Sequence, residues 1–493
     1  MKKKVTLIGA GIASLSAGAY LAKAGYEVTI LEKNNSIGGR GRKFEAEGFV
    51  FDMGPSWYWM PEVFEKFYQD FGHTSSDFYH LKRLSPSYRI FWEDDSQDDI
   101  PSDINDLKKW FEQLEPGSGE KLSQFLKDAQ YKYEVGMNDL VQKPSLQVTE
   151  FFKWNIISGV FKMHLFKPFS KYIRKSFSHP KLLSLLEFPV LFLGAKPEDT
   201  PALYSLMNYA DISLGTWYPE GGMYKIFEAF EKVALEQGVH IKCDAEVDRL
   251  TVQNQKISHV RMTNGDILPS EIVVSGADYA HTDQALLGEF ANYNDAYWDS
   301  RKMAPSSLIF YLGVKERIPN LLHHNLFFDA DFGKHAAEIY DEKQWPEMPL
   351  FYVSCPTQTD SSVAPDGMEN LFILIPIATD LVDDDEIRNK YFHKVMDRLE
   401  KRTKTEIRSK IIYQRSYCVN DFKKDYHAFK GNAYGLANTL KQTAIFKPSL
   451  KHKQISNLFY TGQLTVPGPG VPPSIISGKV VAKQIMKEFP TLN

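Results

Sequence analysis

The sequence of 493 residues is poor in cysteine and carries no excess of positive charge. Its three cysteines, Cys243, Cys355 and Cys418, are odd in number and widely spaced, which excludes a disulfide framework and a cysteine-based zinc cluster. Lys and Arg total 58 against 62 Asp and Glu, so no overall positive field attracts nucleic acid. We therefore expect a protein of a reducing compartment, the cytoplasm, that binds neither a metal ion nor nucleic acid.

The sequence also lacks an obvious membrane-spanning segment. The uncharged run over residues 5–22 follows three lysines and superficially resembles a signal peptide or a membrane anchor. Its pattern is different, because a β-branched stretch over residues 5–8 is broken by glycine before an alanine-rich helical stretch that ends near Gly25. A second strand is predicted over residues 28–31. This order predicts the start of a Rossmann-like α/β domain.

The glycine turn and the acid after the second strand predict a dinucleotide site. Gly9 permits the tight turn, and Gly11 lets a pyrophosphate approach the backbone at the helix N-terminus. Glu32 stands where an acid accepts hydrogen bonds from ribose hydroxyls. Ser14 occupies the third glycine position and is expected to make the packing of helix and strand slightly less close. The expected cofactor contacts in this region are Gly9, Gly11, Ile12, Ala13, Glu32 and Lys33.

Two further turns follow the acid. In Gly38-Gly39-Arg40-Gly41-Arg42, the backbone of Gly39 and the guanidinium groups of Arg40 and Arg42 are suited to wrap the pyrophosphate from its second side. The alternative is a solvated charged loop. The turn Gly54-Pro55-Ser56 is expected to pass close to a flat ligand.

A segment over residues 151–186 combines basic and aromatic residues without any Asp or Glu. Its basic residues are Lys153, Lys162, Lys167, Lys171, Arg174, Lys175 and Lys181. This composition is typical of an interfacial membrane segment, because Trp and Tyr favour the headgroup level and Lys and Arg attract anionic lipid. The alternatives are an amphipathic helix pair with solvated lysines and a single-stranded nucleic-acid surface, which the dinucleotide motif disfavours.

Strand patterns recur after residue 238, with an Asn264-Gly265 turn that indicates a small β-meander. The segment resembles the one that, in dinucleotide-binding flavoproteins, returns to the parallel sheet, and this resemblance implies that Val247 lies beside an adenine. Asp278 follows the returning strand, either at the cofactor or as a plain helix cap. Strands over 307–314 and 371–377 and a helix over 384–400 are predicted beyond it.

The carboxyl terminus carries the second strong motif, a strand that enters the turn Gly462-Gln463. A stiff Pro-Gly loop over residues 465–473 follows, and the last helix is predicted over 474–487. A helix N-terminus here stabilises negative charge on a bound ligand. The expected contacts are Gly462, Gln463, Gly470, Val471 and Pro472. A proline-rich linker is excluded because a helix and the end of the sequence follow at once.

These motifs resemble those of the bacterial-type phytoene desaturases, flavin-dependent carotenoid desaturases related to the amine oxidases. The resemblance rests on GAGIASLSAG, LEK, GGRGR, FDMGPSWYWMPEVF and the final G-Q-x-T-x-P-G-x-G-V-P-P. It implies FAD as the cofactor and an α/β fold with a Rossmann-like FAD-binding domain, a β-sheet substrate domain and a helical membrane-associated region. The FAD-binding parts are expected at 1–75, 216–282 and 441–493, the helical region at 76–215 and the substrate domain at 283–440.

The resemblance further implies desaturation of a long acyclic carotenoid of the phytoene type. A later-step desaturase, for example one acting on the 3,4 bond of a 1'-hydroxy carotenoid, is the alternative. Less favoured are a flavin amine oxidase and a lipid carrier without flavin. The residues identify no general acid or base, and a single glycine fingerprint favours oxygen or a membrane quinone over NAD as the electron acceptor. We expect peripheral association with the cytoplasmic face of the inner membrane.

Overall fold

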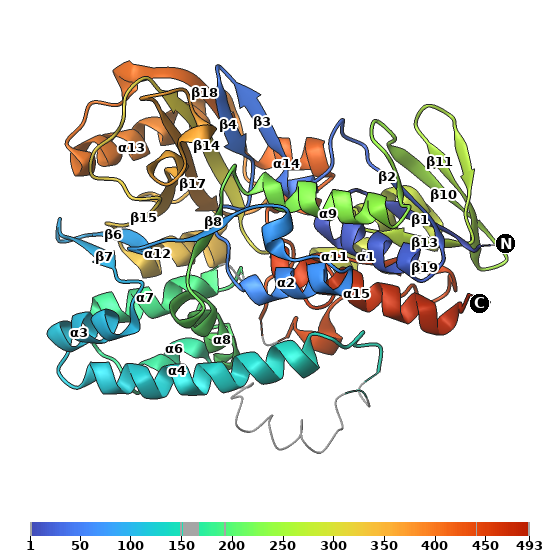
Figure 1. The fold of residues 1–493 in the computed structure, drawn as a ribbon, viewed down its shortest axis with the longest axis horizontal. Helices are drawn as coiled ribbons and strands as arrows, with labels where there is room; N and C mark the ends of the chain where they lie inside the picture. The colour runs from blue at the N-terminus through green and yellow to red at the C-terminus, as the bar shows by residue number, and fades with distance from the viewer. Residues whose placement is uncertain (1, 148–149, 151–166, 192–193, 440, 492–493) are drawn as a thin grey trace.

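The chain builds a parallel sheet, a larger and mostly antiparallel sheet, and a group of helices that lies against the larger sheet (Figure 1). A computed structural model describes residues 2–147, 150, 167–191, 194–439 and 441–491. Residues 151–166, the first part of the expected membrane segment, lie outside this part. The α/β fold expected from the sequence is confirmed.

Within the described residues, the parallel sheet has the order β19-β13-β1-β2-β9. Its strands are β1 (Lys4–Ile8), β2 (Glu27–Leu31), β9 (His240–Lys242), β13 (Ile272–Ser275) and β19 (Leu458–Tyr460). Alternate residues of β13 face opposite cores, since Ile272 and Val274 pack against α1 (Ile12–Lys23), α9 (Tyr224–Glu236) and α15 (Val471–Glu488), and Val273 packs toward the meander. Both faces are thus buried, as a parallel sheet requires.

The meander β10 (Val247–Gln253), β11 (Lys256–Met262) and β12 (Ile267–Pro269) is antiparallel, as its turn signal predicts. The last helix, α15, begins at Val471 rather than at Ser474. The difference has a simple cause, because Pro472 and Pro473 fit the first helical turn, where their missing N–H groups would have no partner.

The larger sheet has the order β18-β14-β17-β16-β15-β6-β7 in the part of the chain that the structure describes. Its strands are β6 (Tyr88–Trp92), β7 (Gln97–Ile100), β14 (Ser306–Val314), β15 (His324–Phe328), β16 (Phe351–Ser354), β17 (Glu369–Ile377) and β18 (Ile411–Tyr417). Along β14, Leu308 and Phe310 pack against α13 (Asp385–Thr403), and Ile309 and Tyr311 face the opposite side. On that opposite side, Ile309 and Tyr311 share one hydrophobic core with helices of residues 104–191.

The region over 76–215 is not purely helical, which corrects the expectation. It contains the antiparallel pair β6 and β7. The pairing of β6 with β15 joins segments more than two hundred residues apart, which local sequence patterns do not report. Its main helices are α3 (Ile104–Leu114), α4 (Ser118–Val135), α6 (Phe169–Ile173), α7 (Pro180–Leu191) and α8 (Leu206–Asn208), gathered along the lower side of Figure 1. Of the helices described, none combines the length and apolarity needed to cross a membrane.

Candidate functional site

One cavity of about 470 Å³ joins the carboxyl ends of the parallel strands to the inner face of the larger sheet. Its first half is lined by the glycine turns and by Glu32, and its second half by apolar side chains of β14, β15, β16 and β17. Seventeen of the eighteen expected contact residues line it, all except Arg42. Ligands of open α/β sheets bind at this end of the strands.

The first glycine turn leaves open space at the N-terminus of α1. Gly9 has a φ of +86°, which favours glycine, and Gly11 precedes the helix without a capping side chain. A Cβ atom added to Gly11 would meet nothing within 4 Å. The backbone N–H groups of the first turn therefore face a space that an anionic group can enter, and the helix dipole favours it there.

Ser14, in place of the third glycine, is accommodated by a glycine on the neighbouring strand turn. A Cβ atom at Gly276 would lie 2.1 Å from the Ser14 Oγ. On the other side of α1, a Cβ atom at Gly478 of α15 would lie 2.3 Å from the Ala13 carbonyl oxygen. The close packing that the motif normally obtains from its third glycine is thus obtained from glycines on the partner elements.

Glu32 is 4% exposed and is held by backbone donors. Its Oε2 accepts from the Ala10 N–H at 2.7 Å, and its Oε1 accepts from the Asn34 N–H at 2.9 Å. A carboxylate has further lone pairs, so Glu32 retains capacity for ribose hydroxyls. The adjacent Lys33 pairs with Glu246 at 3.6 Å, and Val247 follows on β10, so the meander closes this end of the cavity.

The two arginines of the second turn behave differently. Arg40 lines the cavity, and its guanidinium donates to the Gln463 side-chain oxygen at 3.0 and 3.1 Å. Its Nε is buried without a partner among the described residues. Arg42 instead pairs with Asp425 of α14 (Val419–Tyr426) at 2.6 Å, and Asp425 itself lines the cavity. Arg42 is the one expected contact residue outside the cavity lining, and its contact with pyrophosphate stays a prediction.

The turn after β4 (Phe49–Asp52) passes very close to the second glycine turn. A Cβ atom at Gly54 would lie 2.2 Å from the Arg40 carbonyl oxygen, so any side chain there displaces backbone. Pro55 and Ser56 continue the cavity wall. Asp278, for which two roles remained open, caps α10 (Tyr279–His281) by accepting from the His281 N–H at 3.2 Å, and it also lines the cavity.

The carboxyl-terminal turn completes the first half of the cavity. The Gly462 N–H donates to the Ser477 Oγ of α15 at 3.0 Å, which fixes the turn against the last helix. Gly470, Val471 and Pro472 present the N-terminus of α15 to the same cavity. Two helix N-termini, one from each end of the chain, therefore converge on one site.

The comparisons with known proteins agree with this geometry. The model of the family described as flavin containing amine oxidoreductase matches residues 12–486. The chain belongs to this family. A carotenoid 3,4-desaturase of Haloarcula japonica is 39% identical over 98% of both chains, and a zeta-carotene-forming phytoene desaturase of Myxococcus xanthus is 30% identical over 98% of this chain and 94% of its own. An oxidoreductase structure from Methanosarcina mazei, 18% identical, covers 97% of this chain and all of its own with a TM-score of 0.62.

The protein is thus an FAD-dependent oxidoreductase of the carotenoid desaturase type, and the resemblance seen in the motifs is confirmed. The residues present fit FAD. The open space at Gly11, the buried and unpartnered Arg40 Nε and the α15 N-terminus are the features that a dianionic pyrophosphate and an electron-accepting ring require.

The second half of this flavoprotein's cavity was not predicted residue by residue. It is lined mainly by apolar and aromatic side chains, including Trp57, Phe188, Leu326, Phe328, Leu350 and Leu374. Trp57 lies within a motif quoted for the family, but its role in the wall was not recognised. Leu326, Phe328 and Leu374 come from strands of the larger sheet that is covered on both faces, so no alternation of polar and apolar residues distinguished the cavity side.

No catalytic acid or base was predicted, and the described residues place no cluster of three or more metal-binding side chains together. The polar groups in the apolar half are few. One of them, His335, has a buried ring nitrogen that finds no hydrogen-bond partner in the described part of the chain.

Proposed function

We propose that this protein introduces conjugated double bonds into a long acyclic carotenoid. The observation that carries the proposal is the continuity of the cavity, which joins the dinucleotide half directly to an apolar chamber. The chain is also 39% identical to a carotenoid 3,4-desaturase over nearly its full length.

In the proposed reaction, bound FAD supplies the two-electron acceptor for a hydride from a C–H group beside existing double bonds, and the neighbouring carbon loses a proton. The N-terminus of α15 lies at the cavity, and the positive end of its helix dipole stabilises negative charge there. Apolar residues such as Phe328 and Leu374 hold an extended hydrocarbon and exclude water. The wall therefore contributes shape and orientation more than acid or base chemistry.

The substrate is either phytoene-like or a later intermediate. The 39% identity to a carotenoid 3,4-desaturase favours the later intermediate. The test is to incubate the flavin-loaded protein in liposomes with phytoene and, separately, with a hydroxylated acyclic carotene. Desaturation lengthens the conjugated system, so the absorption maximum of the product moves to longer wavelength. No spectral change with either substrate, together with peroxide release on adding amines, would overturn the proposal in favour of an amine oxidase.

We also propose that the basic aromatic segment contacts a membrane surface, where such a substrate resides. Lys171 and Lys175 are exposed. Arg174 pairs with Glu187, and Lys181 lies 3.5 Å from Asp98, so these two charges are partly neutralised within the protein. The double variant K171E/K175E is expected to lose salt-sensitive sedimentation with anionic vesicles, whereas K181E is expected to lose less. Binding that is indifferent to salt and to K171E/K175E would count against this contact.

The proposed electron acceptor is oxygen or a membrane quinone. Mixing the anaerobically photoreduced protein with a quinone analogue is expected to restore the oxidised flavin spectrum. Fast reoxidation by NAD would contradict this part of the proposal.

A further inference from the structure

The apolar half of the cavity contains one buried imidazole with an unused ring nitrogen. His335 lies on α12 (Phe332–Ala337), is 5% exposed and lines the cavity. Its Nδ1 accepts a hydrogen bond from the Leu350 N–H at 3.1 Å. Its Nε2 is buried and has no hydrogen-bond partner among the described residues.

The backbone contact fixes which ring nitrogen carries the proton. Because the Leu350 N–H donates to Nδ1, that nitrogen has no proton, and the neutral ring carries its proton on Nε2. Burial and the nearby Arg398 guanidinium lower the pKa of His335 to about 3, so the ring is neutral at physiological pH. A neutral N–H donor is therefore buried in the wall of an apolar chamber.

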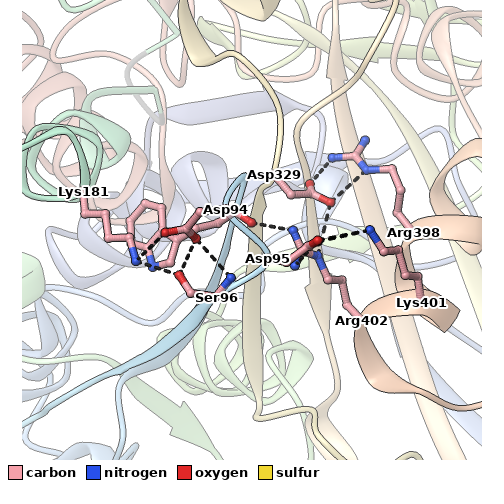
Figure 2. Close-up of polar contacts among 9 residues, drawn as sticks. Asp94, Asp95, Ser96, Lys181, Asp329, Arg398, Lys401 and Arg402 are labelled. Carbon is pink, nitrogen blue, oxygen red and sulfur yellow. Dashed lines mark hydrogen bonds and ion pairs between the residues drawn. The ribbon is translucent and has the colours of Figure 1, made fainter.

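A polar network holds this donor in place. Asp329, which lies between β15 and α12, accepts from Arg398 and pairs with Arg402, as Figure 2 shows. Arg398 also donates to the Pro349 carbonyl oxygen, directly before the Leu350 N–H that orients the imidazole. The ends of β15 and β16 and the start of α12 are thus tied together by α13. The direction of the Nε2–H group is a property of the scaffold and not of a mobile loop.

A buried donor without an acceptor is unfavourable, and natural structures retain one where a ligand completes it. We propose that the Nε2–H group of His335 donates to an oxygen atom carried by the polyene, a hydroxyl or a carbonyl, and so makes this residue a specificity determinant for oxygenated carotenoids. This inference rests on the proposed function. A pure hydrocarbon offers no acceptor and leaves the Nε2–H group unpaired. The protein therefore binds the hydrocarbon less well than the oxygenated carotenoid.

The test compares H335F, which removes the donor, with H335Q, which restores a side-chain N–H. For each protein, kcat/KM is measured with a hydroxylated acyclic carotene and with its parent hydrocarbon in the same liposomes. In H335F the ratio of the two values, hydroxylated over hydrocarbon, is expected to fall at least about tenfold, mainly through KM. H335Q is expected to recover part of that ratio. An unchanged ratio in H335F would overturn the inference.

A second readout separates this inference from the proposed function. Binding of both carotenes to the flavin-loaded protein is measured by quenching of tryptophan fluorescence, without turnover. Preferential binding of the hydroxylated carotene that H335F abolishes supports the role of His335 even if neither compound is desaturated. Desaturation of both compounds with equal binding by the unmodified protein and H335F would overturn it and leave the proposed function intact. Equal flavin content in all three proteins is the control for folding.

Discussion

The two halves of the cavity are built in different ways. The dinucleotide half is made of backbone turns at Gly9, Gly11, Gly54 and Gly462, with few side chains that reach the ligand space. The chamber half is made of side chains on strands and helices that come from distant parts of the chain. Backbone approach demands particular residues at particular positions, whereas an apolar wall accepts many residues of suitable size. The dinucleotide half can therefore be recognised from a sequence motif, whereas the chamber half is defined only by the three-dimensional shape of its wall.

The largest expected effect comes from filling the space at Gly11. In G11A the new methyl group meets no protein atom but occupies the path of the pyrophosphate. We expect the apoprotein to retain its thermal stability and its FAD affinity to fall about a hundredfold, or about 2.7 kcal/mol. Flavin fluorescence titration and scanning calorimetry measure the two quantities. The matched control is G136A, which has ordinary backbone geometry and lies away from the cavity. A fall in apoprotein stability in G11A alone would show that the glycine serves folding and not the ligand.

Filling the chamber is expected to reduce turnover without reducing FAD binding. Leu374 of β17 lines the cavity and is only partly buried, so L374W extends into the cavity. FAD content is expected to stay unchanged, while turnover of an acyclic carotene falls about tenfold or more because the bound chain no longer reaches its reactive position. Absorbance of bound flavin and the rate of product formation are measured on the same samples. Loss of flavin in L374W would mean that the two halves are not independent.

A smaller effect is expected at the ribose end. Glu32→Gln keeps the size of the side chain but removes the charge and one acceptor, so FAD affinity is expected to fall about fivefold to tenfold, or about 1 kcal/mol. Glu27 lies on the same strand, is exposed and pairs loosely with Lys4, which makes Glu27→Gln the matched control. Equal affinities for the two variants in a fluorescence titration would remove Glu32 from the cofactor site.

A last comparison concerns stability, not cofactor affinity or turnover, and sets two buried carboxylates side by side. Glu32 accepts several backbone and side-chain hydrogen bonds, whereas Asp211, beneath the chamber, accepts from Tyr88 at 2.8 Å and Thr216 at 3.3 Å. Burial raises the pKa of Asp211 to about 7. Between its unfolded pKa near 4 and about pH 7, the folded protein therefore holds a proton that the unfolded chain has released. Stability consequently falls as pH rises through this window.

Asp211→Asn removes that titration. Relative to the unmodified protein, the variant is expected to gain stability between pH 4.5 and 7.5, by at most about 1.4 kcal/mol for each unit of pKa shift. Thermal melts at several pH values measure this difference, and D366N, at an exposed loop position, is the control. A stability difference that is constant across this pH range would show that the Asp211 carboxyl does not titrate there.

The sequence predicted the dinucleotide half well, because strands such as β1 and β13 and glycines such as Gly9 carry strong local signals. It predicted less of the remainder. Arg42, expected at the pyrophosphate, forms an ion pair with Asp425 of α14 that no local pattern indicates. The hairpin of β6 and β7 was expected to be helical, but β6 pairs with β15. In both cases the deciding partner lies more than two hundred residues away in the sequence.

By itself the sequence determined the cofactor and the family, since a pyrophosphate-binding turn depends on local backbone freedom that only particular residues allow. The tertiary structure decided where the substrate lies and which groups meet it. Much of the chamber wall comes from strands of a sheet that is covered on both faces. The inward and outward sides of these strands become distinguishable only when α13 covers one face and leaves the other to the cavity. The orientation of the His335 ring was also decided only by the tertiary structure, because it depends on the Leu350 backbone N–H, which comes from another part of the chain.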